Sequence, residues 1–307
     1  DDWWRSEKGV ERAAKGLAEL DERCRATREI CAIPGFEDTA RSGHLGVAFV
    51  DSAVLEAILD EHARERTRGP FIGELVERGA LVTINHPFAG GDRKAKLAEF
   101  GSDLSWKAWT KDAVDGDSKT IEEVATCIEV WNAAAAFGEA ALGAPNKEKL
   151  VGKTLAKIDR LTLATGKRWA LVGGSDNHAF WLLPTTWVRV PARKWPPLAS
   201  EVREALAKGR TCAGGPEATS LEARAGSGPW RKIGDDLAAD GAPIEVRFEG
   251  KGELFLDGRS LGVVEGATRV EVARGSRHHL RLVRGAACSG YIWVDWTRPA
   301  PRERVYR

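Results

Sequence analysis

The segment Gly173-Gly174-Ser175-Asp176-Asn177-His178 has the clearest potential for chemistry, because it places a carboxylate and an imidazole after an apolar run from Trp169 to Val172. Side chains two residues apart point to the same side of an extended backbone. The carboxylate of Asp176 and the imidazole of His178 can therefore bind one metal ion. Taken alone, the segment equally fits a strand-to-loop turn in which Asp176 caps the next element.

Three further residues with metal-binding side chains lie at the edges of predicted strands. His44 follows a glycine, His86 precedes a proline, and Glu37 follows a Pro-Gly pair. In parallel α/β folds, residues beyond the carboxyl ends of separate strands share one crevice, so we expect these side chains to converge with the Asp-x-His pair. Two simpler interpretations stay open: His86 as a buried core histidine, and Glu37 as the ion-pair partner of Arg41.

Imidazoles and carboxylates together suit Zn²⁺, Mn²⁺ or Fe²⁺. Such ions lower the pKa of a bound water and polarise a phosphoryl or carbonyl oxygen. The sequence contains no Ser-His-Asp nucleophile motif, phosphate-binding glycine loop or dinucleotide fingerprint that would predict a different chemistry. The residue pattern therefore favours metal-assisted hydrolysis.

The elements that must position these residues alternate between strands and helices. Helical patterns cover residues 6–28, 52–66, 71–78, 120–126, 146–165 and 198–208. Apolar strand-like runs cover residues 29–32, 45–50, 80–84, 127–131 and 169–172. Apolar strands that alternate with helices predict a parallel sheet covered by helices. Pro87 is expected to end its strand and to hold His86 in an extended conformation.

The pattern changes after about residue 212. Short alternating runs at 244–248, 253–256, 268–272, 279–283 and 291–296 are separated by turn residues, which is typical of a small all-β domain. We therefore predict two domains, residues 1–212 with the metal-binding residues and residues 213–307 as a β-sheet or sandwich. The adjacent histidines at 278 and 279 are predicted to have no metal role.

The composition limits the partners. A net charge of +1 gives no general attraction to nucleic acid, and no apolar run reaches the roughly 18 residues of a membrane span. The five cysteines are scattered without a C-x-x-C pair, which is typical of buried thiols in a reducing compartment and favours the cytoplasm. The expected partner is a small-molecule phosphate ester or a related substrate, and the oligomeric state is open.

Five motifs occur in an order and at spacings that resemble the PHP superfamily, the polymerase and histidinol phosphatase domain. They are Ile33-Pro34-Gly35-Phe36-Glu37, Gly43-His44-Leu45, Thr83-Ile84-Asn85-His86-Pro87, Ile128-Glu129-Val130-Trp131-Asn132 and Gly174-Ser175-Asp176-Asn177-His178. The similarity covers about residues 5 to 212. A β-rich region after residue 212 is similar to the tail of a subset of these phosphoesterases and hydrolases.

The resemblance implies a distorted (β/α)7 barrel of TIM-like architecture with up to three divalent transition metal ions, Zn, Mn or Fe. It implies that Glu37 bridges two ions, that His44 and His86 complete one site, and that Asp176 and His178 belong to neighbouring sites. Further residues of the same motifs are expected to contact the ligands or the substrate: Glu129, Asn132, Ser175 and Asn177.

The family pattern opens with His-x-His and Asp-His motifs that do not occur within residues 1–307. Either they belong to strands that precede residue 1, or this protein lacks several of the ligands and is catalytically impaired. With the residues present, we expect at most one ion to be held firmly, by Glu37, His44 and His86, and phosphate esters to be hydrolysed poorly. Two functions follow: a metal-dependent hydrolase, most simply a phosphoesterase, or a degenerate PHP domain that acts as a non-catalytic binding or scaffolding module.

Overall fold

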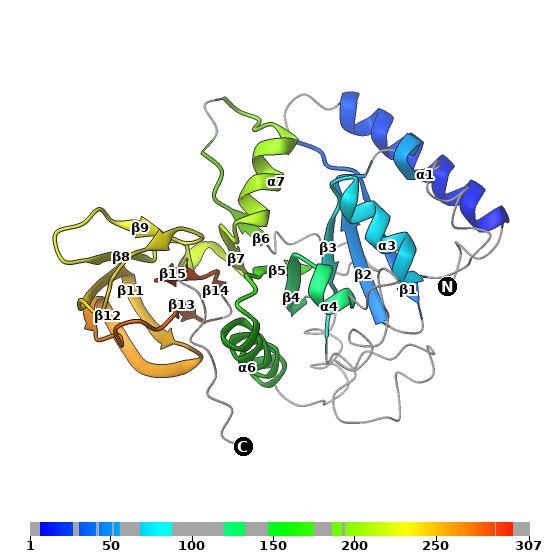
Figure 1. Cartoon of the computed structure of the whole chain (residues 1–307). Helices are drawn as coiled ribbons and strands as arrows, with labels where there is room; N and C mark the ends of the chain where they lie inside the picture. The colour runs from blue at the N-terminus through cyan, green and yellow to red at the C-terminus, as the bar shows by residue number, and fades with distance from the viewer. Residues whose placement is uncertain are drawn as a thin grey trace, which may run out of the picture. The chain divides into compact units, whose positions relative to one another are not determined.

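The computed structural model describes residues 7–26, 31–40, 43–50, 52–55, 68–87, 120–132, 147–174, 186–191, 194–285 and 287–296. The chain divides into two compact units that are discontinuous in sequence. Figure 1 labels the helices and strands of the described residues. One unit comprises Asp1–Glu129 and Val190–Glu204, and the other comprises Val130–Arg189 and Ala205–Arg307. The predicted division into two domains, residues 1–212 and 213–307, stays a prediction.

The first sheet has the strand order β1-β2-β3-β4-β5. Its strands are β1 (Gly35–Ala40), β2 (Gly43–Ala48), β3 (Leu81–Ile84), β4 (Cys127–Asn132) and β5 (Ala170–Gly174). β2 pairs antiparallel with both β1 and β3, and only then does β3 pair parallel with β4. The first three strands therefore form a meander, in which residues of three segments share one face.

Helices accompany these strands along the chain. They are α1 (Glu7–Ala26), α3 (Arg68–Glu77), α4 (Ile121–Val124), α6 (Lys147–Thr165) and α7 (Ala199–Ala207). The short helix α4 begins at a capping box, in which the Thr120 side chain accepts from the Glu123 backbone and the Glu123 side chain accepts from the Thr120 backbone. The described part of the chain contains no helix long and apolar enough to cross a membrane.

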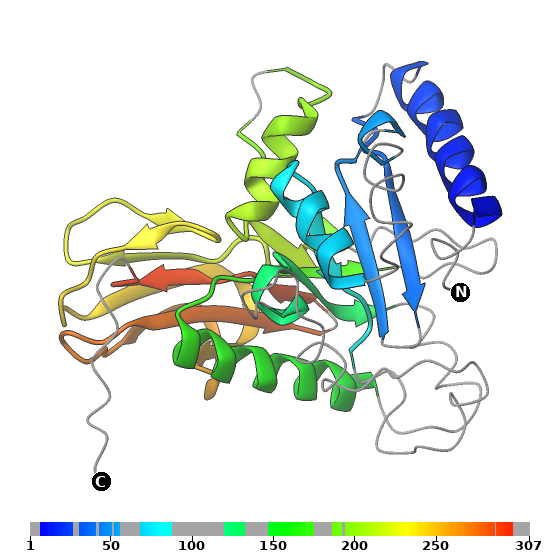
Figure 2. The ribbon, with the colours of Figure 1, turned by 45° about the vertical axis from the view of Figure 1, so that its right-hand side comes forward.

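The second sheet has the order β6-β7-β14-β13-β11-β8-β9, with β12 paired to β11 and β15 paired to β10 and β13. Its strands are β6 (Thr186–Val188), β7 (Thr211–Ala213), β8 (Glu222–Ala225), β9 (Arg231–Lys232), β10 (Asp236–Leu237), β11 (Ile244–Leu256), β12 (Arg259–Val270), β13 (His278–Arg284), β14 (Ala287–Ser289) and β15 (Ile292–Val294), and a 3-10 turn, η4 (Pro216–Ala218), follows β7. Helix α6 runs along this sheet (Figure 2).

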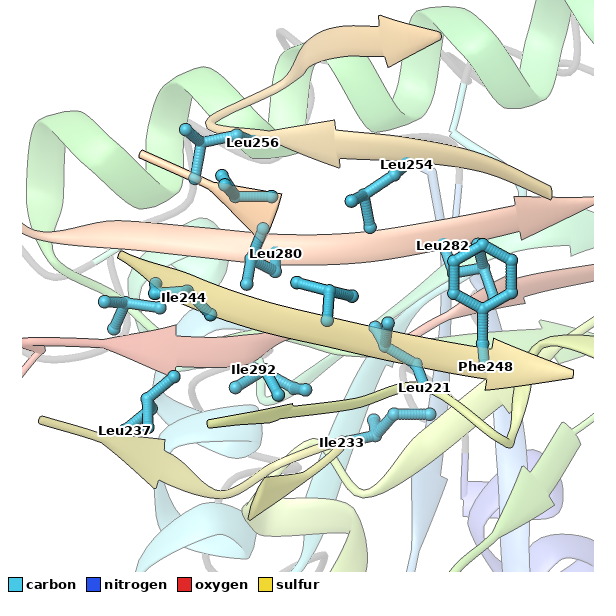
Figure 3. Packing of buried hydrophobic residues seen from close by; sticks show 14 of the residues in the cluster. Leu221, Ile233, Leu237, Ile244, Phe248, Leu254, Leu256, Leu280, Leu282 and Ile292 are labelled. Carbon is cyan, nitrogen blue, oxygen red and sulfur yellow. The ribbon is translucent and has the colours of Figure 1, made fainter. Parts of the chain in front are cut away.

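The core of this sheet is built from alternate residues of its strands. Leu254, Leu280, Leu282 and Ile292 are fully buried and lie together in one apolar cluster (Figure 3). Alternation of buried and exposed residues along β11 matches the period of two that a strand with one buried face requires. The prediction of β structure in this part of the sequence therefore holds.

The prediction of a distorted (β/α)7, TIM-like barrel is wrong. The structure is mostly β, with two sheets of which one is a curled half-barrel. The apolar runs of β2 and β3 pair directly with each other, and Leu45 lies opposite Ile84 in antiparallel register. A buried antiparallel strand has the same continuous apolar run as a parallel one, so the runs alone could not distinguish the two pairings.

Two runs that we predicted as separate strands, 244–248 and 253–256, belong to the single strand β11. The polar residues between them form a bulge, because the pairing of β11 with β12 shifts register between Arg247 and Lys251. Gly250 has a φ of 67° there, a conformation that glycine adopts without steric cost. Glycine and polar residues occur both in bulges and in turns. The sequence pattern therefore could not distinguish a bulge within one strand from a turn between two strands.

The pKa values of the adjacent histidines of β13 are shifted in opposite directions. His278 Nδ1 lies 2.5 Å from Asp257 Oδ2, and its Nε2 lies 3.3 Å from the Ala273 carbonyl oxygen. Both ring nitrogens donate only when the imidazole is protonated, and the hydrogen bond to Asp257 raises the pKa of His278 above 6.5. His279 is fully buried, and burial lowers its pKa.

We expect His278→Gln to destabilise the protein more at about pH 5.5 than at about pH 9. Because the folded-state pKa of His278 is raised, its contribution is fully present below pH 6.5 and is lost as the pH rises through that folded pKa. A hydrogen bond to a charged group contributes about 1.5–3 kcal/mol, which sets the expected cost at the lower pH. Urea unfolding at both pH values measures the difference.

His279 changes stability with pH in the opposite direction, because burial lowers its pKa in the folded state. Below pH 6.5 its imidazole takes up a proton more readily in the unfolded chain, which destabilises the folded state. That contribution is common to both proteins and cancels in the comparison. A cost of His278→Gln that did not change with pH would contradict the protonated pairing with Asp257.

Candidate metal centre

Strand register places Glu37 and His44 on the same face of the first sheet. Glu37 in β1 lies opposite Gly46 in β2, and His44 lies two residues before Gly46. Residues opposite each other share a face, as do residues two apart in one strand. The two side chains are therefore diagonal neighbours across the β1–β2 pair, close enough for a direct contact.

The third strand of the meander brings Asn85 to this face. Gly46 lies opposite Thr83 in β3, and Asn85 follows two residues later. The Asn85 backbone N–H donates to the His44 carbonyl oxygen at 3.1 Å, which extends the β2–β3 pairing beyond the end of β3. The next residue, His86, therefore lies beside the side chains of Glu37, His44 and Asn85.

His86 adopts a left-handed backbone conformation with a φ of 28°. The prediction that Pro87 would hold it extended is therefore wrong. The backbone N–H of His86 donates to Glu129 Oε2 at 2.5 Å, and this buried carboxylate of β4 stabilises the turn after β3. A short, buried hydrogen bond of this kind can offset the cost of an unfavourable φ. The preference of the residue before a proline does not include this contact.

Glu37, His44 and His86 converge as predicted, with one ligand atom of each lying within 4.8 Å of the others. His44 Nδ1 lies 3.2 Å from His86 Nε2. Glu37 Oε1 lies 3.7 Å from the first of these nitrogens and 3.6 Å from the second. Among the residues that the structure describes, this is the single such group of three.

The route to convergence differs from the predicted one. We expected residues at the carboxyl ends of parallel strands to meet in a crevice. Instead, Glu37 and His44 lie within antiparallel neighbours, and His86 lies in the turn that follows the third strand. Antiparallel pairing joins these residues through cross-strand contacts within the sheet.

The three donor atoms have the spacing that a metal ion requires. Donors about 2.1 Å from a tetrahedral ion lie about 3.4 Å from one another. The observed separations of 3.2, 3.6 and 3.7 Å lie close to this value. Two imidazole nitrogens and one carboxylate oxygen are also a donor set of zinc enzymes. Both the spacing and the chemistry of the group therefore fit a divalent transition metal ion.

Glu37 is ionised at neutral pH. Its contact with His86 and its hydrogen bond from Asn85 outweigh the opposing effect of burial and lower its pKa from 4.5 to about 2. The exposed fraction of the three side chains rises from 7% for His86 to 22% for His44 and 37% for Glu37. The group is therefore anchored on one side and open to solvent on the Glu37 side.

The other predicted site residues have different outcomes. Asp176, His178, Ser175 and Asn177 lie outside the described residues, so their metal and substrate roles stay predictions. Glu129 contacts the His86 backbone as described above, and Asn132 is the last residue of β4, with its role in substrate binding still a prediction.

Sequence reasoning assigned no role to Asn85, although its side chain contacts the candidate ligands. Its Nδ2 donates to Glu37 Oε1 at 2.7 Å. The available signal was the alternation along β3, which puts Thr83 and the residue two positions later on one face. That signal becomes useful only once the strand paired with β3 is known.

Comparison with known proteins identifies no relative of this chain: no family model, no curated protein and no solved structure matches it.

Proposed function

We propose that this protein is a metal-dependent hydrolase in which Glu37, His44 and His86 bind one divalent transition metal ion. The observation that carries the proposal is the mutual spacing of the three donor atoms, 3.2 to 3.7 Å, in a carboxylate and two imidazoles. Three protein ligands leave a position for water, which distinguishes a catalytic ion from a structural one with four protein ligands.

A bound ion would supply an activated water and polarise the oxygen of a phosphoryl or carbonyl group. The protein's own residues would hold and orient the reacting groups. His86 is the buried anchor, because Glu129 holds its backbone from β4. Glu37 has the most exposed side chain of the three, so substrate would approach from its side.

The proposed substrate is a phosphate ester, with other esters, amides or carbamates as variants on the same site. This choice of substrate depends on the similarity of the five motifs to those of the PHP phosphoesterases. The proposal for the metal does not depend on that similarity, because it depends on the geometry of Glu37, His44 and His86.

Metal analysis of the purified protein, followed by assay of the reloaded protein, tests the proposal. We expect chelator treatment to yield a metal-free protein that takes up one Zn²⁺, Mn²⁺ or Fe²⁺ per chain at this site and then hydrolyses an aryl phosphate. His278→Gln is the control histidine variant and should take up the same amount of metal.

Failure to bind any of these ions would overturn the proposal. Metal binding without turnover of aryl phosphates, esters or amides would instead favour a non-catalytic module. Selective binding of Fe²⁺ with oxygen consumption would identify an oxygenase, since two histidines and one carboxylate also hold iron in that class of enzyme.

A further inference from the structure

We infer that Asn85 is a positioning residue of the metal centre, whose side-chain amide holds the carboxylate of Glu37 in the orientation that meets the two histidines. The inference rests on the proposed metal site. In this role Asn85 is not a metal ligand and acts through the carboxylate of Glu37.

The first observation is that Asn85 and the histidines share the same oxygen of Glu37. Asn85 Nδ2 donates to Oε1 at 2.7 Å. The same Oε1 is the atom that lies 3.6 Å from His86 Nε2 and 3.7 Å from His44 Nδ1. A carboxylate oxygen has two lone pairs, so it can accept from the amide and still face the imidazoles.

The second observation is that Asn85 has a direct connection to all three candidate ligands. Its side chain bonds to Glu37, its backbone N–H bonds to the His44 carbonyl oxygen at 3.1 Å, and it precedes His86 in the chain. A shift of Asn85 would therefore disturb the spacing of the whole group. Its amide and the His86 imidazole both reach Glu37 Oε1 from the segment that follows β3.

The third observation is the glycine beneath the Asn85 amide. A Cβ at Gly46 would lie 3.1 Å from Asn85 Oδ1 and 3.5 Å from Asn85 Nδ2. A Cβ at this place would be tighter than an ordinary contact with the amide oxygen, so the amide would have to shift by a few tenths of an ångström. The space above Gly46 is therefore used by the group that orients the carboxylate.

Asn85→Leu is the direct test, because leucine has a similar size and cannot donate a hydrogen bond. Loss of a group that orients a metal ligand weakens metal binding by about 10–100-fold. We expect that loss in the Zn²⁺ affinity, measured by competition with a chromophoric chelator. We also expect a changed visible spectrum of the Co²⁺-loaded protein, because that spectrum reports the arrangement of the ligands.

Thr83→Val is the matched control. It changes β3 two residues earlier, on the same face, and leaves the Asn85 amide and the Glu37 carboxylate in place. Its Zn²⁺ affinity and Co²⁺ spectrum should equal those of the unmodified protein. Thermal unfolding of the metal-free variants confirms that each one is folded before its affinity is compared.

Gly46→Ala provides a second test that removes no polar group. The added methyl group should displace the side-chain amide of Asn85 and thereby weaken Zn²⁺ binding. In a protein that already has leucine at position 85 there is no amide to displace, so Gly46→Ala should have little further effect. The double variant Gly46→Ala/Asn85→Leu should therefore bind Zn²⁺ with nearly the affinity of Asn85→Leu alone. Additive losses would show that Gly46 acts independently and would contradict the inference.

The outcomes separate this inference from the proposed function. If the unmodified protein binds no metal, the proposed function itself fails. If it binds Zn²⁺ and folded Asn85→Leu binds equally well with an unchanged Co²⁺ spectrum, only the role of Asn85 is wrong.

Discussion

Replacing His86 with asparagine should weaken Zn²⁺ binding by more than about 100-fold, because loss of a ligand exceeds the 10–100-fold effect of losing a ligand's hydrogen-bond partner. Asparagine is the suitable replacement, since it tolerates the left-handed conformation that His86 adopts with a φ of 28°. The variant should keep its turn and its backbone hydrogen bond to Glu129 while it loses the imidazole. Competition with a chromophoric chelator measures the affinity.

His44→Gln should have an effect of the same size, because its Nδ1 lies as close to Glu37 Oε1 as the His86 nitrogen does. His278→Gln is the control, since that histidine lies in β13 and pairs with Asp257. Hydrolysis of an aryl phosphate should fall in parallel with bound metal. Zn²⁺ affinity that was equal in His86→Asn, His44→Gln and the unmodified protein would exclude this group as the metal site.

The second large effect should come from Asp159 in α6. Its Oδ2 accepts from Arg281 Nη2 at 2.8 Å and its Oδ1 accepts from the Tyr291 hydroxyl at 2.8 Å, and all three side chains are buried. Removing one charge of a buried pair leaves the other uncompensated and costs about 3–5 kcal/mol. We therefore expect Asp159→Asn to lower the free energy of unfolding by that amount in a urea titration.

An exposed ion pair of the second sheet provides the matched control. Arg224 and Glu245 lie opposite each other in β8 and β11, and their side chains are 34% and 48% exposed. Exposed pairs contribute about 0–1 kcal/mol, so Glu245→Gln should change stability little. A cost of Asp159→Asn no larger than that of Glu245→Gln would contradict a desolvated pair.

The buried pair also allows a prediction of opposite sign. Replacing both charges with apolar side chains, as in Asp159→Leu/Arg281→Met, removes the desolvation cost together with the attraction. We expect this double variant to recover most of the stability that Asp159→Asn loses. Persistent destabilisation of the double variant would show that the hydrogen bond from Tyr291, which asparagine can still accept and leucine cannot, contributes to stability beyond the charge pair.

The sequence by itself was sufficient for several local elements and for the three candidate ligands. It placed the first strand wrongly, at residues 29–32, whereas the structure has β1 at Gly35–Ala40. The strand-like runs at β2, β3 and β4 and the helical pattern of α1 and α6 appear near their predicted positions, because side-chain periodicity depends on the local backbone alone. The convergence of Glu37, His44 and His86 was also predicted, because few residues have metal-binding side chains at strand ends.

The tertiary structure decided which strands pair and in which direction. Periodicity places a side chain on a face of its strand, but the neighbouring strand is selected by contacts between residues far apart in the chain. The antiparallel pairing of β1, β2 and β3 replaced the predicted barrel and brought Asn85 against Glu37. The parallel pairing of β3 with β4 brought Glu129 to the His86 backbone. These contacts join residues more than 40 positions apart, as Asn85 and Glu37 are, so no local pattern could specify them.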